Sequence, residues 1–233
     1  MDLKPLAAVL TFVFTFAFAP GLAEADQDYC RGVNFDIKRP LVVAKVSVPS
    51  RVYFVKGADE SVTCPSDAAG CSEPSYLVPG DLVLTGKTHG AYVCAAFQSP
   101  LARKQDWTNG WLPTSALSSV APAPAPKVSD WIGEWVHPGG SITISEGNRG
   151  MLKIDGLQTY PAALNVHTGV LEAEVKPAQA MIAFADDGST PFDKADKGQC
   201  LVRMQRVDTW LAVEDNEGCG GVMVTFTGLY RRK

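Results

Sequence analysis

The sequence has few residues that bind metals. It contains three histidines, and they are scattered at His89, His137 and His167, each in a turn-like context. No two cysteines have the C-x-x-C spacing of a zinc knuckle. The acidic stretch from Asp186 to Asp196 lacks the spacing of an EF-hand calcium loop, and a solvated acidic loop is the simpler interpretation. We therefore expect no metal and no cofactor.

The familiar catalytic patterns are missing as well. The chain has no G-x-S-x-G nucleophile motif, and no glycine-rich phosphate or dinucleotide loop follows a strand and opens a helix. Acidic residues such as Glu134, Asp187 and Asp215 occur, as they do in any chain of this size. We expect no catalytic residue and no enzymatic activity, with a hydrolase built on dispersed acidic residues as the alternative.

Strong charge and long apolar runs are also scarce. The formal net charge of −4 argues against a nucleic-acid surface, which is markedly basic. The one sustained apolar run, 6–18, follows Lys4 and precedes Ala23-Glu24-Ala25. This arrangement is typical of a secretory signal peptide with a small-x-small cleavage site. We expect residues 1–25 to be removed, a mature chain from Asp26 without an integral membrane segment, and a periplasmic or secreted location. An uncleaved membrane anchor is the alternative.

Cysteine is present in an even number, and all six residues lie after the predicted cleavage site. Export to an oxidising compartment favours disulfides. Four cysteines precede residue 100 and two follow residue 199, so Cys200 with Cys219 is the most secure pair. Within the first group we favour Cys64 with Cys71, and by elimination Cys30 with Cys94. The connectivity of these four is open from the sequence.

A proline-rich stretch separates the two cysteine groups. Residues 120–126 alternate alanine and proline after Val120 and carry no charge, which favours an extended, semi-rigid spacer. We therefore predict a first module over 27–119, a linker over 120–127 and a second module over 128–233.

The first module reads as a series of short strands. Runs at 51–55, 81–85, 91–97 and 110–112 are separated by turn-forming residues, with no helix between them. The order Pro79-Gly80-Asp81, Gly90-Ala-Tyr92-Val and Gly110-Trp111-Leu112, closed by Ser115-Ala-Leu117, resembles a bacterial Src-homology-3-like domain.

That resemblance implies a small β-barrel that binds peptidoglycan or a peptide in the cell envelope. It also implies an aromatic groove to which Tyr92, Trp107 or Trp111 would contribute. For Trp111 we favour a core position over a place in this groove, and an exposed loop position is an even alternative for Trp107. The insertion between Lys56 and Pro79 departs from the family pattern and would remodel such a groove.

The second module shows clear strand alternation. Ile142, Ile144, Leu152 and Ile154 fall on one face of a predicted hairpin. In a predicted last strand over 222–230, the apolar residues Val222, Val224, Phe226 and Tyr230 share one face.

Gly133-Glu134-Trp135 and the closing Phe226-Thr-Gly-Leu-Tyr-Arg231 are similar to the lipocalin and avidin-like barrels. The similarity implies that Arg231 or Arg232 stacks over Trp135 where the first and last strands meet. The module also resembles uncharacterised proteobacterial envelope proteins that share the string around Cys219, a likeness that implies a compartment and no activity.

The sequence thus predicts an all-β protein of two small antiparallel barrels or curled sheets joined by an Ala/Pro linker. The leading functional hypothesis is an exported, non-catalytic binding protein of the bacterial cell envelope, with peptidoglycan, a peptide or an envelope protein as its partner. The alternative is a secreted inhibitor of a hydrolase such as lysozyme, which would insert the rigid loop from Glu214 to Gly221.

Overall fold

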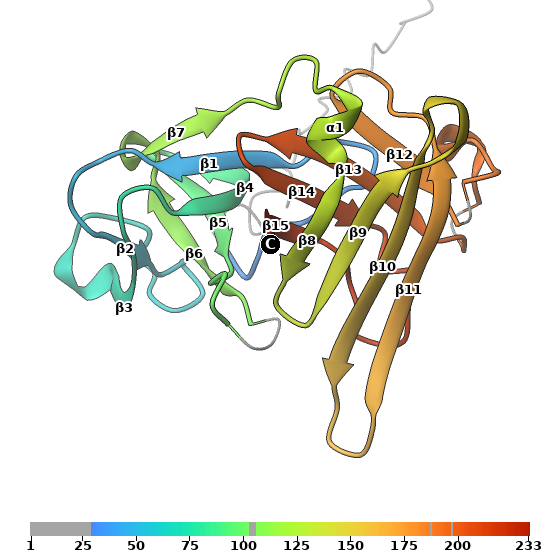
Figure 1. Ribbon diagram of the computed structural model, residues 1–233. Helices are drawn as coiled ribbons and strands as arrows, with labels where there is room; N and C mark the ends of the chain where they lie inside the picture. The colour runs from blue at the N-terminus through green and yellow to red at the C-terminus, as the bar shows by residue number, and fades with distance from the viewer. Residues whose placement is uncertain (1–28, 103–105, 187, 197) are drawn as a thin grey trace, which may run out of the picture.

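The structure is a computed structural model that describes residues 29–102, 106–186, 188–196 and 198–233 (Figure 1). The predicted signal peptide, its cleavage site and Asp187 lie outside the described residues. Two antiparallel sheets make up the fold, which confirms the predicted all-β class.

The first sheet has the strand order β3-β2-β6-β5-β4-β1-β7. Its strands are β1 (Val42–Val46), β2 (Val52–Val55), β3 (Ser72–Leu77), β4 (Leu82–His89), β5 (Tyr92–Phe97), β6 (Thr108–Pro113) and β7 (Leu117–Val120). Two short 3-10 turns, η1 (Ala69–Cys71) and η2 (Thr114–Ala116), precede β3 and β7. Alternating residues of β1, β2 and β5 point inward, so Val46, Phe54 and Ala95 share one core with Leu77 and Leu112.

The second sheet has the order β11-β10-β9-β8-β15-β14-β13-β12. Its strands are β8 (Gly133–His137), β9 (Gly140–Glu146), β10 (Leu152–Pro161), β11 (Val166–Val175), β12 (Met181–Ala185), β13 (Leu201–Val207), β14 (Trp210–Asp215) and β15 (Gly228–Arg232). The short helices are α1 (Val128–Trp131), η3 (Asn148–Gly150) and η4 (Phe192–Lys194). The sheet curls until its end strands β11 and β12 approach each other, which makes it nearly a closed barrel.

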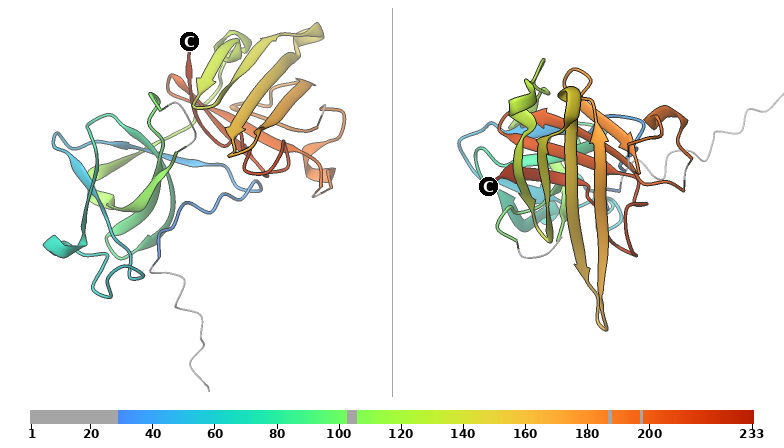
Figure 2. Two further views of the ribbon diagram at one scale, coloured as in Figure 1. Left: turned by 90° about the horizontal axis from the view of Figure 1, so that it is seen from below. Right: turned by 45° about the vertical axis from the view of Figure 1, so that its right-hand side comes forward.

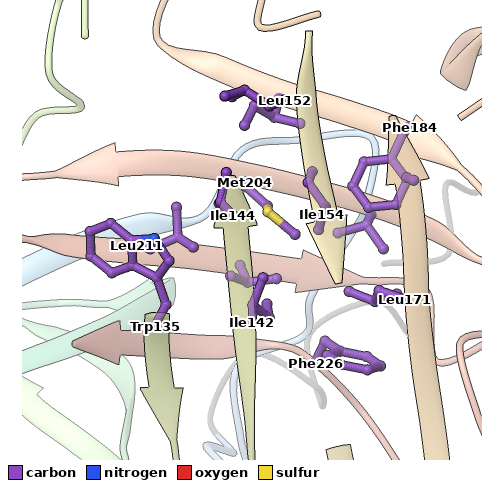
Figure 3. Close-up of a cluster of buried hydrophobic side chains, with 14 of the residues drawn as sticks. Trp135, Ile142, Ile144, Leu152, Ile154, Leu171, Phe184, Met204, Leu211 and Phe226 are labelled. Atoms are coloured by element: carbon purple, nitrogen blue, oxygen red, sulfur yellow. The ribbon is translucent and has the colours of Figure 1, made fainter. Parts of the chain in front are cut away.

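Large apolar side chains fill the interior of this second sheet. Ile142, Ile144, Leu152 and Ile154 all lie there, as their alternation predicts, and Trp135 packs beside them (Figure 3). Because side chains occupy this space, the curled sheet encloses a packed core.

The predicted last strand is wrong in its first half. Strand β15 begins only at Gly228, and Val222 is 73% exposed although Val224, Phe226 and Tyr230 are buried. Met223 has a positive φ of 67°, which a β-strand does not accommodate. The segment instead crosses β11, where Gly220 pairs with Gly169. This close approach requires glycine, because a Cβ on Gly169 would lie 2.5 Å from the Cys219 carbonyl oxygen.

The two sheets share an apolar cluster, which we call the junction cluster. Val43, Leu84 and Ala96 from the first sheet pack with Val207 and Ala212 from the second. The Ala/Pro stretch runs beside this contact, since the Ala123 N–H donates to the Arg206 carbonyl at 2.8 Å. The Gln205 side chain also donates to the carbonyl of Leu41, which precedes β1. The sheets therefore lie against each other across a partly apolar junction, and Figure 2 shows them side by side.

Candidate functional site

The aromatic residues expected to line a groove in the first sheet do not form one. Trp111 and Tyr92 are buried together beside the disulfides, at 0% and 7% exposure. Trp107 belongs to the junction cluster, where its ring lies 6.1 Å from that of Phe35. The rings are buried because β5 and β6 are central strands, so the core interpretation holds for Trp111.

A different pair of aromatic rings is exposed on this sheet. Tyr53 and Tyr76 lie opposite each other on β2 and β3, with ring centroids 5.6 Å apart and more than two fifths of each residue exposed. The Arg51 guanidinium lies 4.3 Å from the Tyr76 ring. Nothing in the sequence marks these two residues, because one exposed tyrosine per strand is an ordinary feature of a sheet.

At the end of the curled sheet, two arginines enclose Trp135. The guanidinium carbons of Arg206 and Arg232 lie 4.4 and 4.9 Å from its ring centre. Arg232 also donates to the carbonyls of Asp130 and Ile132, which fixes its position. Arg231 is exposed and does not stack there, because neighbouring residues of a strand point to opposite faces. The closure implied by the lipocalin and avidin-like resemblance is thus made by Arg232 and Arg206.

All six cysteines are paired as expected. The structure joins Cys200 to Cys219, Cys64 to Cys71 and Cys30 to Cys94. No free cysteine is left. Three disulfides are typical of a protein from an oxidising compartment.

A cavity lies at the junction of the two sheets. It has a volume of about 680 Å³, within the usual range of ligand sites. Its walls are the segment from Tyr29 to Val42, Thr85 to Lys87 of β4, and Glu214 of β14. A second cavity of about 510 Å³ is lined by part of the same segment and by Asp215 to Glu217. We call the two cavities together the junction cleft.

The segment that divides the junction cleft is held at both ends. The Cys30–Cys94 disulfide ties its start to β5, and the Leu41 carbonyl accepts the hydrogen bond from Gln205 near its end. Val33 and Phe35 belong to the junction cluster, whereas Asn34 between them is exposed. Phe35 and Val33 thus anchor the extended stretch 33–36, which is followed by a turn at 37–38.

Glu214 and Arg203 form a buried ion pair at the base of the cleft. Their nearest oxygen and nitrogen are 3.8 Å apart, too far for a hydrogen bond, and the two side chains are 1% and 9% exposed. Neither carboxylate oxygen of Glu214 has a hydrogen-bond partner among the described residues, and neither do Nε and Nη1 of Arg203. The Arg203 guanidinium also lies 5.2 Å from the Phe192 ring centre.

This pair is electrostatically unusual. Burial raises the pKa of the Glu214 carboxyl to about 7, even though the nearby Arg203 charge acts to lower it. Burial also lowers the pKa of the Arg203 guanidinium, against the attraction of Glu214. Buried polar groups in folded proteins nearly always have partners, so unsatisfied ones point to a missing ligand or water. A perturbed carboxyl that lines a cavity is a candidate binding residue.

The neighbouring Asp215 differs from Glu214 in that one of its two oxygens has hydrogen-bond partners, whereas its Oδ2 is buried without one. Asp215 accepts hydrogen bonds on one oxygen from the hydroxyls of Thr225 and Thr227. The loop after it is clipped by the Cys200–Cys219 disulfide and rests on β11. The loop from Glu214 to Gly221 is therefore packed onto the sheet and does not project as a free inhibitory loop.

The three histidines, the cysteines and the acidic residues are the possible metal ligands of the chain. No group of three or more histidine, cysteine or acidic side chains within the described ranges is close enough to hold a metal ion. His137 is buried and stacked on Tyr230, with ring centroids 4.5 Å apart. Within the same described ranges, no helix is long and apolar enough to span a membrane.

Comparison with protein-family models, with curated proteins and with solved structures found no match to this chain. The functional assignment therefore depends on the geometry of the junction cleft.

Proposed function

We propose that this chain is an exported, non-catalytic binding protein of the bacterial cell envelope, periplasmic or secreted, and that the junction cleft is its ligand site. The observation that carries the proposal is the Glu214 carboxyl, which lines the larger cavity of the junction cleft and is buried with no hydrogen-bond donor to either oxygen among the described residues. A ligand that donates to Glu214 would supply the missing partner.

The lining of the cleft favours binding over catalysis. A hydrolase would place a nucleophile or a second carboxyl where it can act with Glu214 on one bond. The other acidic residue of the larger cavity, Asp36, is already engaged with Arg39 at 3.0 Å. The walls of the cavity are largely polar, with Arg31 paired to Asp59 and Arg39 to Asp36, and this suits a polar, extended partner such as peptidoglycan, a peptide or an envelope protein.

The test is cosedimentation of the purified mature protein with peptidoglycan sacculi. We expect the wild-type protein to bind and Glu214→Gln to lose at least tenfold in affinity. Glu172→Gln is the matched control, because Glu172 is on β11, exposed and away from the cleft. Equal binding by Glu214→Gln and wild type would rule out the cleft as the site. Failure of the wild type to bind sacculi, peptides or envelope extract would overturn the function.

One feature favours a second candidate, an inhibitor of a hydrolase such as lysozyme. The β10–β11 hairpin projects beyond the body of the molecule (Figure 1), and residues 156–171 contain no lysine, arginine, aspartate or glutamate. Leu164 near its tip is 99% exposed, and Leu157, Val166 and Val170 are more than half exposed. An inhibitor would lower lysozyme activity at stoichiometric concentration, and Leu164→Asp would abolish the effect.

A further inference from the structure

The segment between the two cavities has the properties of an unpaired β-strand. Residues 33–36 contain no helix or turn, and Val33 and Phe35 face the junction cluster while Asn34 faces outward. Alternation with period two is the geometry of a strand. The segment nevertheless belongs to neither sheet.

Apart from the Asp36 carbonyl, the backbone groups of this segment have no backbone partners among the described residues. Among the backbone hydrogen bonds of the described residues, the only one within 31–39 joins the Arg39 N–H to the Asp36 carbonyl. From Val33 to Phe35, neither an N–H nor a carbonyl takes part in any such bond. Exposed strand edges of this kind are templates for pairing with another extended chain.

Both edges of the segment open onto free space. Val33, Asn34, Phe35 and Asp36 line the larger cavity and also the smaller one. The Cys30–Cys94 disulfide and the Gln205 hydrogen bond hold the ends of the segment, which restricts its movement into either cavity. Gly86 of β4 leaves room for this crossing, since a Cβ there would lie 3.2 Å from the Val33 side chain.

From this geometry we propose, on the basis of the proposed binding function, that the ligand is an extended peptide that pairs with the backbone of Val33–Asp36 as an added strand. Strand addition supplies affinity through main-chain hydrogen bonds, and side-chain pockets supply selectivity. In the larger cavity Glu214 accepts from a donor side chain of the peptide. A lysine fits best, because its ammonium group carries only donors and an opposite charge.

A lysine side chain would also supply the hydrogen-bond donors that the Glu214 carboxylate lacks. Arg203 is 3.8 Å from Glu214 and faces Phe192, so it leaves both Glu214 oxygens without a donor. Charge-assisted hydrogen bonds are roughly twice as strong as neutral ones, so an ammonium group would satisfy the carboxylate more fully than a hydroxyl.

The probe is the blocked peptide acetyl-Thr-Val-Lys-Val-Thr-amide carrying a fluorescent label, followed by anisotropy with the full mature protein. The matched ligands replace lysine by glutamate, or carry N-methyl groups on the lysine and one valine, so that each edge of the peptide loses an N–H donor. N-methylation removes the N–H donors of strand pairing and keeps the side chains. We expect at least a tenfold loss of affinity for each matched ligand, and a similar loss for Glu214→Gln but not for Glu172→Gln.

Amide hydrogen exchange gives a second, independent measurement. We expect the amides of Val33–Asp36 to exchange rapidly in the free protein and at least tenfold more slowly with the lysine peptide bound. Binding of the peptide without protection of these amides, or equal binding of the N-methylated peptide, would overturn strand addition. Sacculus binding without any peptide binding would also overturn it and would leave the proposed function standing.

Discussion

At the scale of single residues, the ionisable groups buried in the molecule set opposing pH dependences. Glu214 has a pKa raised by burial to about 7. His137 has a pKa lowered by burial to about 3. Stability depends on pH wherever the folded and unfolded states bind different numbers of protons. As the pH falls below 7, the contribution of Glu214 to the free energy of unfolding therefore rises, whereas that of His137 falls.

For Glu214, ionisation destabilises the folded state. In the unfolded chain the carboxyl loses its proton near pH 4.5, whereas the folded protein keeps the proton until about pH 7. Between these values the folded state binds more protons, so stability falls as pH rises. The raised pKa means that desolvation outweighs attraction to Arg203. Glu214→Gln is expected to raise the free energy of unfolding at pH 8 by about 3 kcal/mol. At pH 4.5 the same substitution is expected to change the free energy of unfolding only slightly.

Urea denaturation of wild type and Glu214→Gln at pH 4.5, 6 and 8 measures this difference, with Glu172→Gln as control. A variant that is less stable than wild type at pH 8 would contradict it. A residue that costs stability while lining a cavity is typical of a functional site.

For His137 the sign is reversed. The unfolded imidazole gains a proton below about pH 6.5, whereas the buried ring stays neutral until about pH 3. The unfolded state binds more protons in that window, so stability is lost as pH falls. His137→Leu cannot titrate and is expected to flatten the decline between pH 6.5 and 4, whatever its stability at pH 7. Thermal melts of wild type and His137→Leu across this range test the slope, and equal slopes for the two proteins would contradict it.

Glu214 could not be identified as a site residue from the sequence. It stands in an acidic, glycine-rich string that reads as a surface turn. Its burial arises because it points from the outer face of β14 toward the junction, beside Ala212, while Leu211 and Val213 point into the curled sheet. That face is covered by a segment about 180 residues earlier in the chain, and no local pattern encodes such a contact.

At the scale of elements, alternation and turn residues predicted the strands that have one buried and one exposed face. The hairpin of β9 and β10 is such a case. Strand β3 was missed because its sequence Ser-Glu-Pro-Ser-Tyr-Leu is polar and contains proline, which is tolerated at a sheet edge. The last strand was placed too early because Val222 continues the apolar alternation, although the glycines before it redirect the chain across β11.

The crossing of β11 by the loop around Cys219 predicts a large effect from a small substitution. A Cβ at Gly169 would meet the Cys219 carbonyl at 2.5 Å and the Val224 side chain at 2.8 Å. Gly169→Ala is expected to destabilise the protein by about 2 kcal/mol, in the range of overpacked sites. Gly70→Ala is the matched control, since nothing lies within 4 Å of a Cβ there. Equal melting temperatures of the two variants would contradict this contact.

At the scale of the whole molecule, the two sheets are linked by more than the Ala/Pro stretch. The junction cluster contains small, ordinary residues such as Ala96 and Ala212, which give no sign in the sequence that they are shared between sheets. The division into a first module, a linker and a second module stays a prediction. The contact across it explains why the candidate site lies between the two groups of strands.

The junction cluster can be opened by one buried charge. Ala212 is 1% exposed, so Ala212→Asp places an unpaired carboxylate between the sheets. We expect a loss of about 3 kcal/mol or more, and a larger radius of gyration in small-angle scattering as the sheets separate. Val62→Asp, at a position 92% exposed, serves as control. An unchanged radius together with unchanged stability would show that the sheets do not depend on this cluster.

The Cys30–Cys94 bond has a consequence for when the protein becomes active. It fixes the start of the segment that divides the junction cleft, while the two sheets have hydrogen-bonded cores of their own. A chain whose thiols are still reduced would lack this tie, and the segment proposed to bind the peptide would be held by the Gln205 hydrogen bond near its other end alone. Ligand capture would then begin only after oxidation, so a newly made molecule would not occupy its cleft with peptides met before reaching an oxidising compartment.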